Sequence, residues 1–203
     1  MIKAIIFDFD GVIGDTYDIS LKVAKQLNNN ITEQEFKDLF IGDIFEKYKQ
    51  KFQPKDIPVF FEKQRELFTP QNLFPVKQLL QNLQKRYQLF VVSGSADENI
   101  INFLSLGNYG HYFQKILGST THRSKTEKFS MIYEKFHLSN KECLFVTDTV
   151  GDITDAKEAN VKCIAVTWGY HSEDLLRKQR PTAIAHTIGE LQNIINDLAN
   201  KFS

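Results

Sequence analysis

The chain has 203 residues, of which 42% are hydrophobic, so it is long enough for one large domain, or for a core domain with a small insert. Lysine plus arginine equals aspartate plus glutamate at 25 each, which argues against a broad basic surface for nucleic acid or anionic lipid. No apolar stretch approaches the roughly 18 residues of a membrane span, and the N-terminus lacks a signal-peptide pattern. Cys143 and Cys163 lie in apolar runs and are expected to be buried free thiols, which favours a reducing, cytoplasmic location.

The first residues predict a buried strand followed by a helical insert. Residues 2–7 form an apolar run broken only by Lys3, which is typical of a strand buried in a parallel sheet. Residues 17–72 then show helical patterns and no convincing strand, with helices expected at 17–27, 32–40, 44–51 and 56–68. We therefore expect a small helical domain, residues 17–72, inserted into a core formed by residues 1–16 and 73–203.

After the insert, predicted strands and helices alternate. Apolar residues at helical spacing predict helices over 76–83, 129–136 and 191–198, and apolar runs predict strands at 87–92, 114–117, 143–146, 161–166 and 182–185. Such alternation is typical of a parallel sheet with right-handed crossovers. The sequence therefore predicts an α/β fold, a Rossmann-like parallel sheet core with an inserted α-helical domain.

Two acids stand at the end of the first predicted strand. Asp8 and Asp10 are two residues apart, so in an extended segment both side chains would point to one side and crowd together. A hard divalent cation with oxygen ligands would relieve this repulsion. The alternative is a pair of solvated acids in a turn.

Other polar groups follow later strands, at what should be the same edge of the sheet. Ser93-Gly94-Ser95 precedes a helix that begins near Asp97, which suits a phosphate or an ordinary helix cap. Asp148 and Asp152 flank the next helix start, where acids are also common caps. Lys125 opens the helix before that strand, with Lys128 as a nearby competitor. Acids, hydroxyls and a lysine converging on one edge suit phosphoryl transfer.

These motifs resemble those of the haloacid dehalogenase superfamily of hydrolases. Residues 8–16, with the sequence DFDGVIGDT, resemble the first motif, Ser93 the second, Lys125 the third, and residues 148–152 the acidic fourth. The helical insert stands where this family has its type-one cap, and residues 166–170 (VTWGY) resemble the phosphoglycolate phosphatase-like branch. Two positions depart from the family pattern: Thr147 stands where a glycine is common, and Thr126 where a proline is common.

The resemblance implies a role for each matched residue. Asp8 would attack phosphorus and form an aspartyl-phosphate, and Asp10 would protonate the leaving alcohol and then activate water. Ser93, Gly94 and Lys125 would bind the phosphoryl group. Asp8, Asp10 and Asp148 would hold Mg²⁺, Asp10 through its backbone carbonyl, while Asp152 would orient Lys125 or a metal-bound water. All four acids are therefore predicted to belong to the metal site.

The expected function is Mg²⁺-dependent hydrolysis of a small phosphorylated metabolite, with no nucleic-acid or membrane partner. Two alternatives remain at this stage. One is a sugar phosphomutase, although the insert has one arginine, Arg65, and no histidine. The other is a non-enzymatic phosphoaspartate receiver or scaffold. Residues 41–45, a break between insert helices, are a candidate specificity loop or an ordinary turn. The substrate and the oligomeric state are left open by the sequence.

Overall fold

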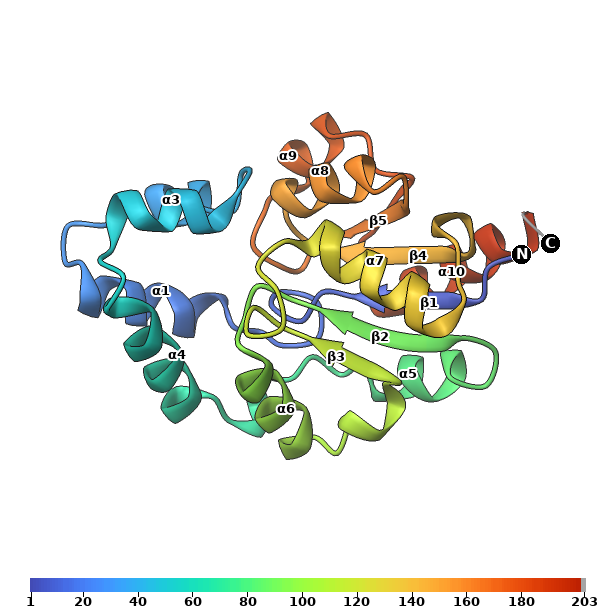
Figure 1. Cartoon of the computed structure of the whole chain (residues 1–203), viewed down its shortest axis with the longest axis horizontal. Coiled ribbons are helices and arrows are strands. Elements are labelled where there is room, and N and C mark those ends of the chain that lie inside the picture. The colour runs from blue at the N-terminus through green and yellow to red at the C-terminus, as the bar shows by residue number, and fades with distance from the viewer. Residues whose placement is uncertain (202–203) are drawn as a thin grey trace.

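The computed structural model describes residues 1–201 and contains a six-stranded parallel sheet in the order β3-β2-β1-β4-β5-β6 (Figure 1). All neighbouring strands pair in parallel. The strands are β1 (Ala4–Phe7), β2 (Gln88–Val92), β3 (Lys115–Leu117), β4 (Cys143–Thr147), β5 (Lys162–Val166) and β6 (Ala183–Ala185). The central position of β1, between β2 and β4, brings the polar segments that follow these three strands to one edge. The predicted α/β class and parallel sheet are confirmed.

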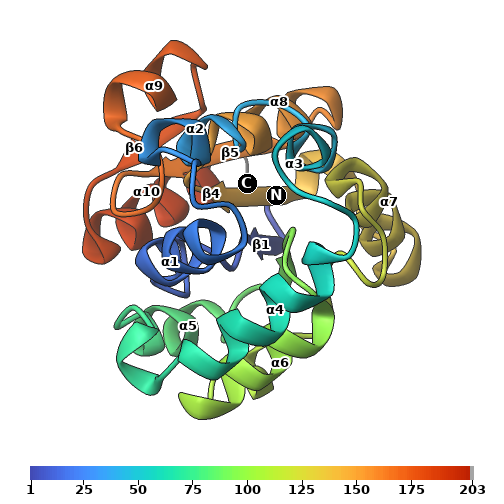
Figure 2. The same ribbon diagram turned by 90° about the vertical axis from the view of Figure 1, so that its left-hand side faces the viewer.

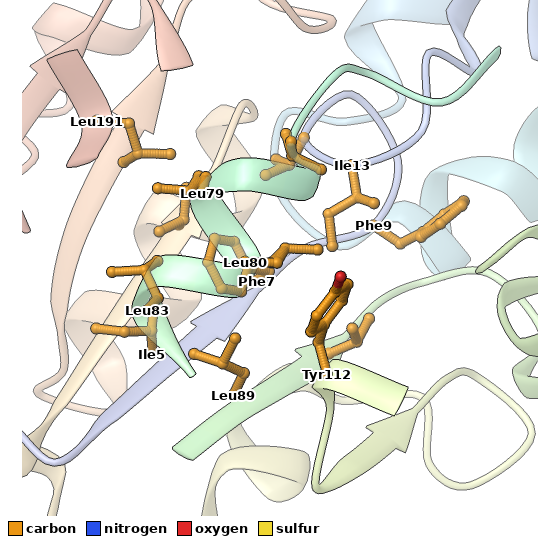
Figure 3. Packing of buried hydrophobic residues seen from close by; sticks show 14 of the residues in the cluster. Ile5, Phe7, Phe9, Ile13, Leu79, Leu80, Leu83, Leu89, Tyr112 and Leu191 are labelled. Atoms are coloured by element: carbon orange, nitrogen blue, oxygen red, sulfur yellow. The ribbon is translucent and has the colours of Figure 1, made fainter. Parts of the chain in front are cut away.

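Helices cover both faces of the sheet because its central strands are apolar on both sides. In β1, Ile5 and Phe7 join one buried cluster, whereas Ala4 and Ile6 join the other. The first cluster includes residues of α5 (Lys77–Leu83), α6 (Asp97–Leu106) and α10 (Ile188–Lys201), and Figure 3 shows α5 leucines packed over β1. The second includes residues of α7 (Lys125–Phe136), α8 (Val150–Glu158) and α9 (Glu173–Lys178). Short 3₁₀ turns complete the core at η2 (Gly110–Tyr112) and η3 (Asn140–Glu142).

Residues 17–72, which we call the insert, lie at the carboxyl end of the strands (Figures 1 and 2). They form α1 (Tyr17–Leu27), α2 (Glu33–Asp38), α3 (Ile44–Lys51), α4 (Asp56–Leu67) and η1 (Pro70–Asn72). The insert has its own apolar cluster, joined from the core by Tyr170. The chain leaves and re-enters the core through adjacent segments, because Asp15 N–H donates to the Asn72 carbonyl (2.7 Å) and Phe74 N–H donates to the Ile13 carbonyl (2.9 Å).

The structure adjusts several predicted elements. The helix expected at 32–40 is shorter, because Thr32 is its N-cap in a capping box with Glu35 and the chain turns after Asp38. Helix α9 was not predicted from the sequence. Cys143 and Cys163 are buried free thiols, as expected. Within residues 1–201, no helix combines the length and apolarity needed to cross a bilayer.

Candidate active site

Asp8 lies immediately after β1, at the centre of the polar edge of the sheet. Its side chain is buried: Oδ1 accepts a hydrogen bond from the Phe9 N–H (2.7 Å), and Oδ2 accepts one from Lys125 Nζ (2.8 Å). Lys125 is the first residue of α7, and its Nζ also lies 2.5 Å from Asp152 Oδ2. One buried ammonium group therefore joins two carboxylates that are 144 positions apart in the chain.

The three charges of this group shift one another's pKa. Burial alone would lower the pKa of Lys125, but the charges of Asp152 and Asp8 outweigh burial and raise it. Burial raises the pKa of Asp8 well above its usual range, against the opposing effect of Lys125. The pKa of Asp152 is lowered, since Lys125 and the Thr147 hydroxyl (2.5 Å) outweigh the effect of burial. The closer ion pair is thus Lys125 with Asp152, and Asp8 is left partly uncompensated.

Asp10 takes different partners from Asp8. Strand β1 ends at Phe7, and Asp10 lies in a turn bridged to Gly14, so the extended geometry that would crowd both carboxylates does not continue. The hydroxyls of Ser93 (3.0 Å) and Ser95 (2.7 Å) donate to Asp10 Oδ2. A third hydroxyl, from Thr16, donates to Oδ1 at 2.8 Å. Asp10 is therefore fixed by three neutral donors beside the cavity described below.

The predicted phosphate-binding loop and the second lysine meet behind Asp10. Lys128 is fully buried, and its Nζ donates to the Ser93 carbonyl at 2.5 Å. Burial, together with the nearby charge of Lys125, lowers the pKa of Lys128 to about 8. Of the two candidate lysines, Lys125 is the one that contacts Asp8, while Lys128 holds the loop backbone. Gly94 lines the cavity, and the Ser93 hydroxyl points to Asp10.

Asp148, at the end of β4, has an oxygen that lacks a partner. Its Oδ2 accepts the Tyr170 N–H at 2.7 Å, but its buried Oδ1 has no hydrogen-bond partner among the described residues. Glycine is required beside it, because a Cβ at Gly11 would lie 1.9 Å, and one at Gly169 2.2 Å, from Oδ2. Burial raises the pKa of Asp148 to about 8. A buried carboxylate with a free oxygen is suited to a cation ligand.

The four predicted metal ligands are not equivalent in the structure. The Asp10 carboxylate accepts three hydroxyl donors, and that of Asp152 is bound by Lys125 and Thr147. Asp8 accepts one donor on each oxygen, and Asp148 is the carboxylate with an oxygen that has no partner, so Asp148 is the one most available to a cation. Residues 1–201 contain no group of three or more aspartate, glutamate, histidine or cysteine side chains already arranged around a metal position. Mg²⁺ commonly needs only one or two carboxylates and keeps several waters, so the residues fit such an ion.

A cavity of about 560 Å³ extends from Asp8 into the insert. Its floor includes Asp10, Gly94, Lys125 and Asp152, and its far wall is formed by residues of the insert. The predicted specificity loop contributes to the lining through residues 42–45. The site is therefore a cavity, partly open to solvent, that joins the charged edge of the sheet to the insert.

Two contacts hold the insert against the fourth motif. The Gly151 N–H donates to the Phe40 carbonyl at 2.9 Å. His171 bridges the two parts: its Nδ1 accepts the Val150 N–H (2.9 Å) and its Nε2 donates to the Lys37 carbonyl (3.1 Å). Both bonds require the neutral Nε2–H tautomer, and burial lowers the pKa of His171, which favours that form.

A buried chain of polar groups continues from Asp10 into the insert. The Tyr170 hydroxyl lies 3.0 Å from Thr16 Oγ1 and 3.2 Å from Ser20 Oγ, and Gln64 Nε2 donates to Ser20 Oγ at 3.0 Å. Sequence reasoning did not assign roles to Thr16, Tyr170, Ser20 or Gln64. Thr16 and Tyr170 do fall within the segments that resemble family motifs, which was the available signal.

Comparisons with known proteins agree with this geometry. The sequence pattern of the haloacid dehalogenase-like hydrolases matches residues 5–166. The chain is 28% identical over 186 residues to a phosphoglycolate phosphatase of Aquifex aeolicus, covering 83% of this chain and 86% of the relative. It is 28% identical over 212 residues to the pyrophosphatase PpaX of Oceanobacillus iheyensis, covering 97% and 98%. The solved structure of β-phosphoglucomutase from Clostridium difficile has the same fold, with a TM-score of 0.77 at 20% identity and coverage of 100% and 99%. The family pattern runs from β1 to the end of β5 and includes the motif residues from Asp8 to Asp152. The chain therefore belongs to the haloacid dehalogenase-like hydrolases.

Proposed function

We propose that this hydrolase is a Mg²⁺-dependent phosphatase that cleaves a small phosphomonoester through an aspartyl-phosphate on Asp8. The observation that supports this most directly is the setting of Asp8. Its carboxylate is buried at the end of β1, is held by a backbone N–H and by Lys125, and lines the cavity. A fixed carboxylate beside a cation is suited to nucleophilic attack on a phosphoryl group, whose negative charge the cation offsets.

The reaction would proceed in two displacements. An Asp8 carboxylate oxygen attacks phosphorus, the bond from phosphorus to the ester oxygen breaks, and Asp10 gives its proton to the departing alkoxide. Water then attacks the phosphorus of the aspartyl-phosphate, Asp10 accepts the proton of that water, and inorganic phosphate leaves with Asp8 regenerated. The hydroxyls of Thr16, Ser93 and Ser95 stabilise the anionic form of Asp10 between these steps.

Lys125 and Asp152 position the phosphoryl group and offset its charge. Lys125 is held by Asp152, which in turn is held by Thr147, so the ammonium group keeps its place when Asp8 is modified. The proposed Mg²⁺ would be held by Asp8, Asp148 and the Asp10 backbone carbonyl, and when bound it would supply further positive charge at the phosphoryl oxygens. The unpartnered Asp148 Oδ1 supports this assignment.

The insert is proposed to act as a cap that determines substrate choice, with domain limits at residues 16–17 and 72–73. The paired exit and return segments support these limits. The catalytic candidates all come from residues outside the insert, whereas the far wall of the cavity comes from it. Substitutions in the wall should therefore alter the ranking of substrates and leave the chemistry itself in place.

A direct test follows the phosphoryl group. Purified protein is given p-nitrophenyl phosphate with and without Mg²⁺, and release of inorganic phosphate is measured together with the mass of acid-quenched protein. We expect Mg²⁺-dependent phosphate release, loss of it in excess EDTA, and a phosphoryl adduct that is absent in Asp8→Asn. A folded Asp8→Asn variant that keeps more than a few per cent of the activity would exclude Asp8 as nucleophile. Transfer of phosphate to a second sugar hydroxyl without release would instead identify a mutase.

A further inference from the structure

The wall of the cavity that faces Asp8 is apolar and aromatic, and we call it the aromatic wall. It consists of six side chains of α3 and α4: Ile44, Phe45, Tyr48, Ile57, Phe60 and Phe61. All six are half-buried, although large apolar side chains of this kind are usually covered completely. The rings pack on one another, Tyr48 with Phe60 at a centroid distance of 6.1 Å and Phe60 with Phe61 at 5.8 Å, and still leave a face open to the cavity. Figure 2 places α3 and α4 at the end of the molecule where the insert lies.

Outside the phosphate-binding floor, the charged residues that line the cavity are mostly acidic. Asp43 and Glu46 come from the insert, and Asp155 and Glu158 come from α8. None of the lysines or the arginine of the insert is among the lining residues within the described chain. Arg123 also lines the cavity, but it is exposed and stacks on the aromatic wall, its guanidinium carbon 5.5 Å from the Phe45 ring centroid. A second anionic group on a substrate would therefore meet four acidic side chains, the exposed Arg123 and the imidazole of His122, which also lines the cavity. Burial raises the pKa of one of the four acids, Asp155, to about 7.

We propose that the substrate is a phosphate monoester with a flat, apolar, uncharged body of one or two rings, and with the phosphate as its only anionic group. This inference rests on the proposed phosphatase function, in which the charged floor of the cavity binds the phosphate end of the substrate. The aromatic wall then stabilises the body by removing apolar surface from water and by stacking. The four acids disfavour competitors with a second negative charge, which is how many sites achieve specificity. Two compounds would therefore be poor substrates of this protein: phosphoglycolate, because it carries a second anionic group, and pyrophosphate, because it has no uncharged body.

A matched series of esters tests the proposal. The steady-state kcat/KM is measured in saturating Mg²⁺ for ethyl phosphate, 2-phenylethyl phosphate and 2-phosphoglycolate, with p-nitrophenyl phosphate as a reference for catalysis. Ethyl and phenylethyl phosphate share a primary alkoxide leaving group, so their ratio reports the ring alone. We expect 2-phenylethyl phosphate to exceed ethyl phosphate by about tenfold or more, as burial of a ring predicts. We expect 2-phosphoglycolate to be the poorest of the three.

A charge reversal then tests the acidic lining. Glu158→Lys should raise the kcat/KM for 2-phosphoglycolate relative to 2-phenylethyl phosphate by about threefold or more, and roughly 1 M salt should abolish the gain. Glu134→Lys is the matched control: it is an exposed acid of α7 that does not line the cavity, and it should leave the ratio unchanged.

The outcomes separate this inference from the function on which it rests. Activity on p-nitrophenyl phosphate with equal rates for the ethyl and phenylethyl esters, or with 2-phosphoglycolate as the best substrate, would overturn the substrate class and leave the phosphatase in place. If Glu158→Lys and Glu134→Lys changed the ratio of kcat/KM for 2-phosphoglycolate to that for 2-phenylethyl phosphate equally, the role of the acidic lining would be overturned. Absence of phosphate release from every ester would overturn the proposed function itself.

Discussion

Replacement of Tyr170 by phenylalanine should destabilise the protein, although it removes only one oxygen atom. The Tyr170 hydroxyl lies within hydrogen-bond distance of Thr16 and Ser20, and all three side chains are buried. The ring itself packs against residues of the insert, with centroid distances of 5.1 Å to Tyr17 and 4.7 Å to Phe40. Phenylalanine keeps these ring contacts and the backbone N–H that Asp148 accepts, so the substitution isolates the hydroxyl.

The size of the effect follows from the partners left behind. Without the Tyr170 hydroxyl, Thr16 keeps its bond to Asp10 and Ser20 keeps the bond from Gln64, but each loses its contact with Tyr170. A hydrogen bond contributes about 0.5–1.5 kcal/mol net, so the loss of two should lower the free energy of unfolding by about 1–3 kcal/mol. The Thr16 bond to Asp10 should also weaken, because Thr16 is freed from its fixed position.

Tyr133 provides a control with the same chemical change and the opposite expectation. Its hydroxyl on α7 is buried and has no hydrogen-bond partner among residues 1–201, and burial raises its pKa. Removal of an already unsatisfied hydroxyl should be neutral, or stabilising by up to about 1 kcal/mol. The pair Tyr170→Phe and Tyr133→Phe therefore separates the loss of a hydrogen-bonded hydroxyl from the loss of an oxygen atom as such.

Urea unfolding of both variants in metal-free buffer measures these differences, provided that the denaturant slope m stays unchanged. Single-turnover hydrolysis gives a second readout. If the buried polar groups from Thr16 to Tyr170 position Asp10, Tyr170→Phe should lose more activity on an alkyl phosphate than on p-nitrophenyl phosphate. The alkyl leaving group needs a proton donor, and p-nitrophenolate needs one far less. Equal stability of the two variants would show that the buried polar groups around Tyr170 do not stabilise the fold. Equal losses on both esters would show that they do not position Asp10.

Three further predictions concern the site itself. Asp10→Asn should lower single-turnover cleavage of an alkyl phosphate by about 10²–10⁴-fold and that of p-nitrophenyl phosphate much less, and equal losses would remove its acid–base role. Gly169→Ala should abolish Mg²⁺-dependent activity, because the new methyl group would lie 2.2 Å from Asp148 Oδ2, whereas Gly110→Ala, which adds a methyl group in open space, should be neutral in the same assay. Burial raises the pKa of Asp148 to about 8, so the proposed Mg²⁺ must displace a proton below that pH. Calorimetry should then show that the affinity of the protein for Mg²⁺ rises with pH toward 8, by up to about tenfold per pH unit, and that binding releases protons. A Mg²⁺ affinity independent of pH would contradict this.

The sheet and the order of its motifs could be predicted because both depend on local patterns. Apolar runs followed by polar residues marked all six strands, with ends shifted by one or two residues. The first strand begins at Ala4, two residues after the start of the apolar run, yet Ile2 is buried all the same. Helix α9 escaped prediction because its apolar residues, Leu175 and Leu176, are adjacent and so show no helical spacing.

The inner contacts of the site could not be predicted because they join residues far apart in the chain. Tyr170 meets Asp148 across 22 positions and Thr16 across 154. Lys128 was considered only as a competitor for Lys125, because a lysine is usually exposed and its complete burial depends on the Ser93 carbonyl. Asp8 and Asp10 have separate partners because the chain turns after β1, whereas the alternation of side chains along a strand would place both carboxylates on the same side.

The balance of buried charge links the proposed metal to substrate binding as well as to chemistry. Lys125 compensates Asp152 and shares its charge with Asp8, while Asp148 has no cation within hydrogen-bond distance in the described chain. The other buried lysine, Lys128, donates to the Ser93 carbonyl and not to a carboxylate, so it pairs with none of these acids directly. A phosphate dianion that enters this site adds negative charge to carboxylates already in excess, which is costly where water is excluded. A divalent cation beside Asp8 and Asp148 would remove that cost, so Mg²⁺ and phosphate should each strengthen the binding of the other by the same factor, as thermodynamic linkage requires.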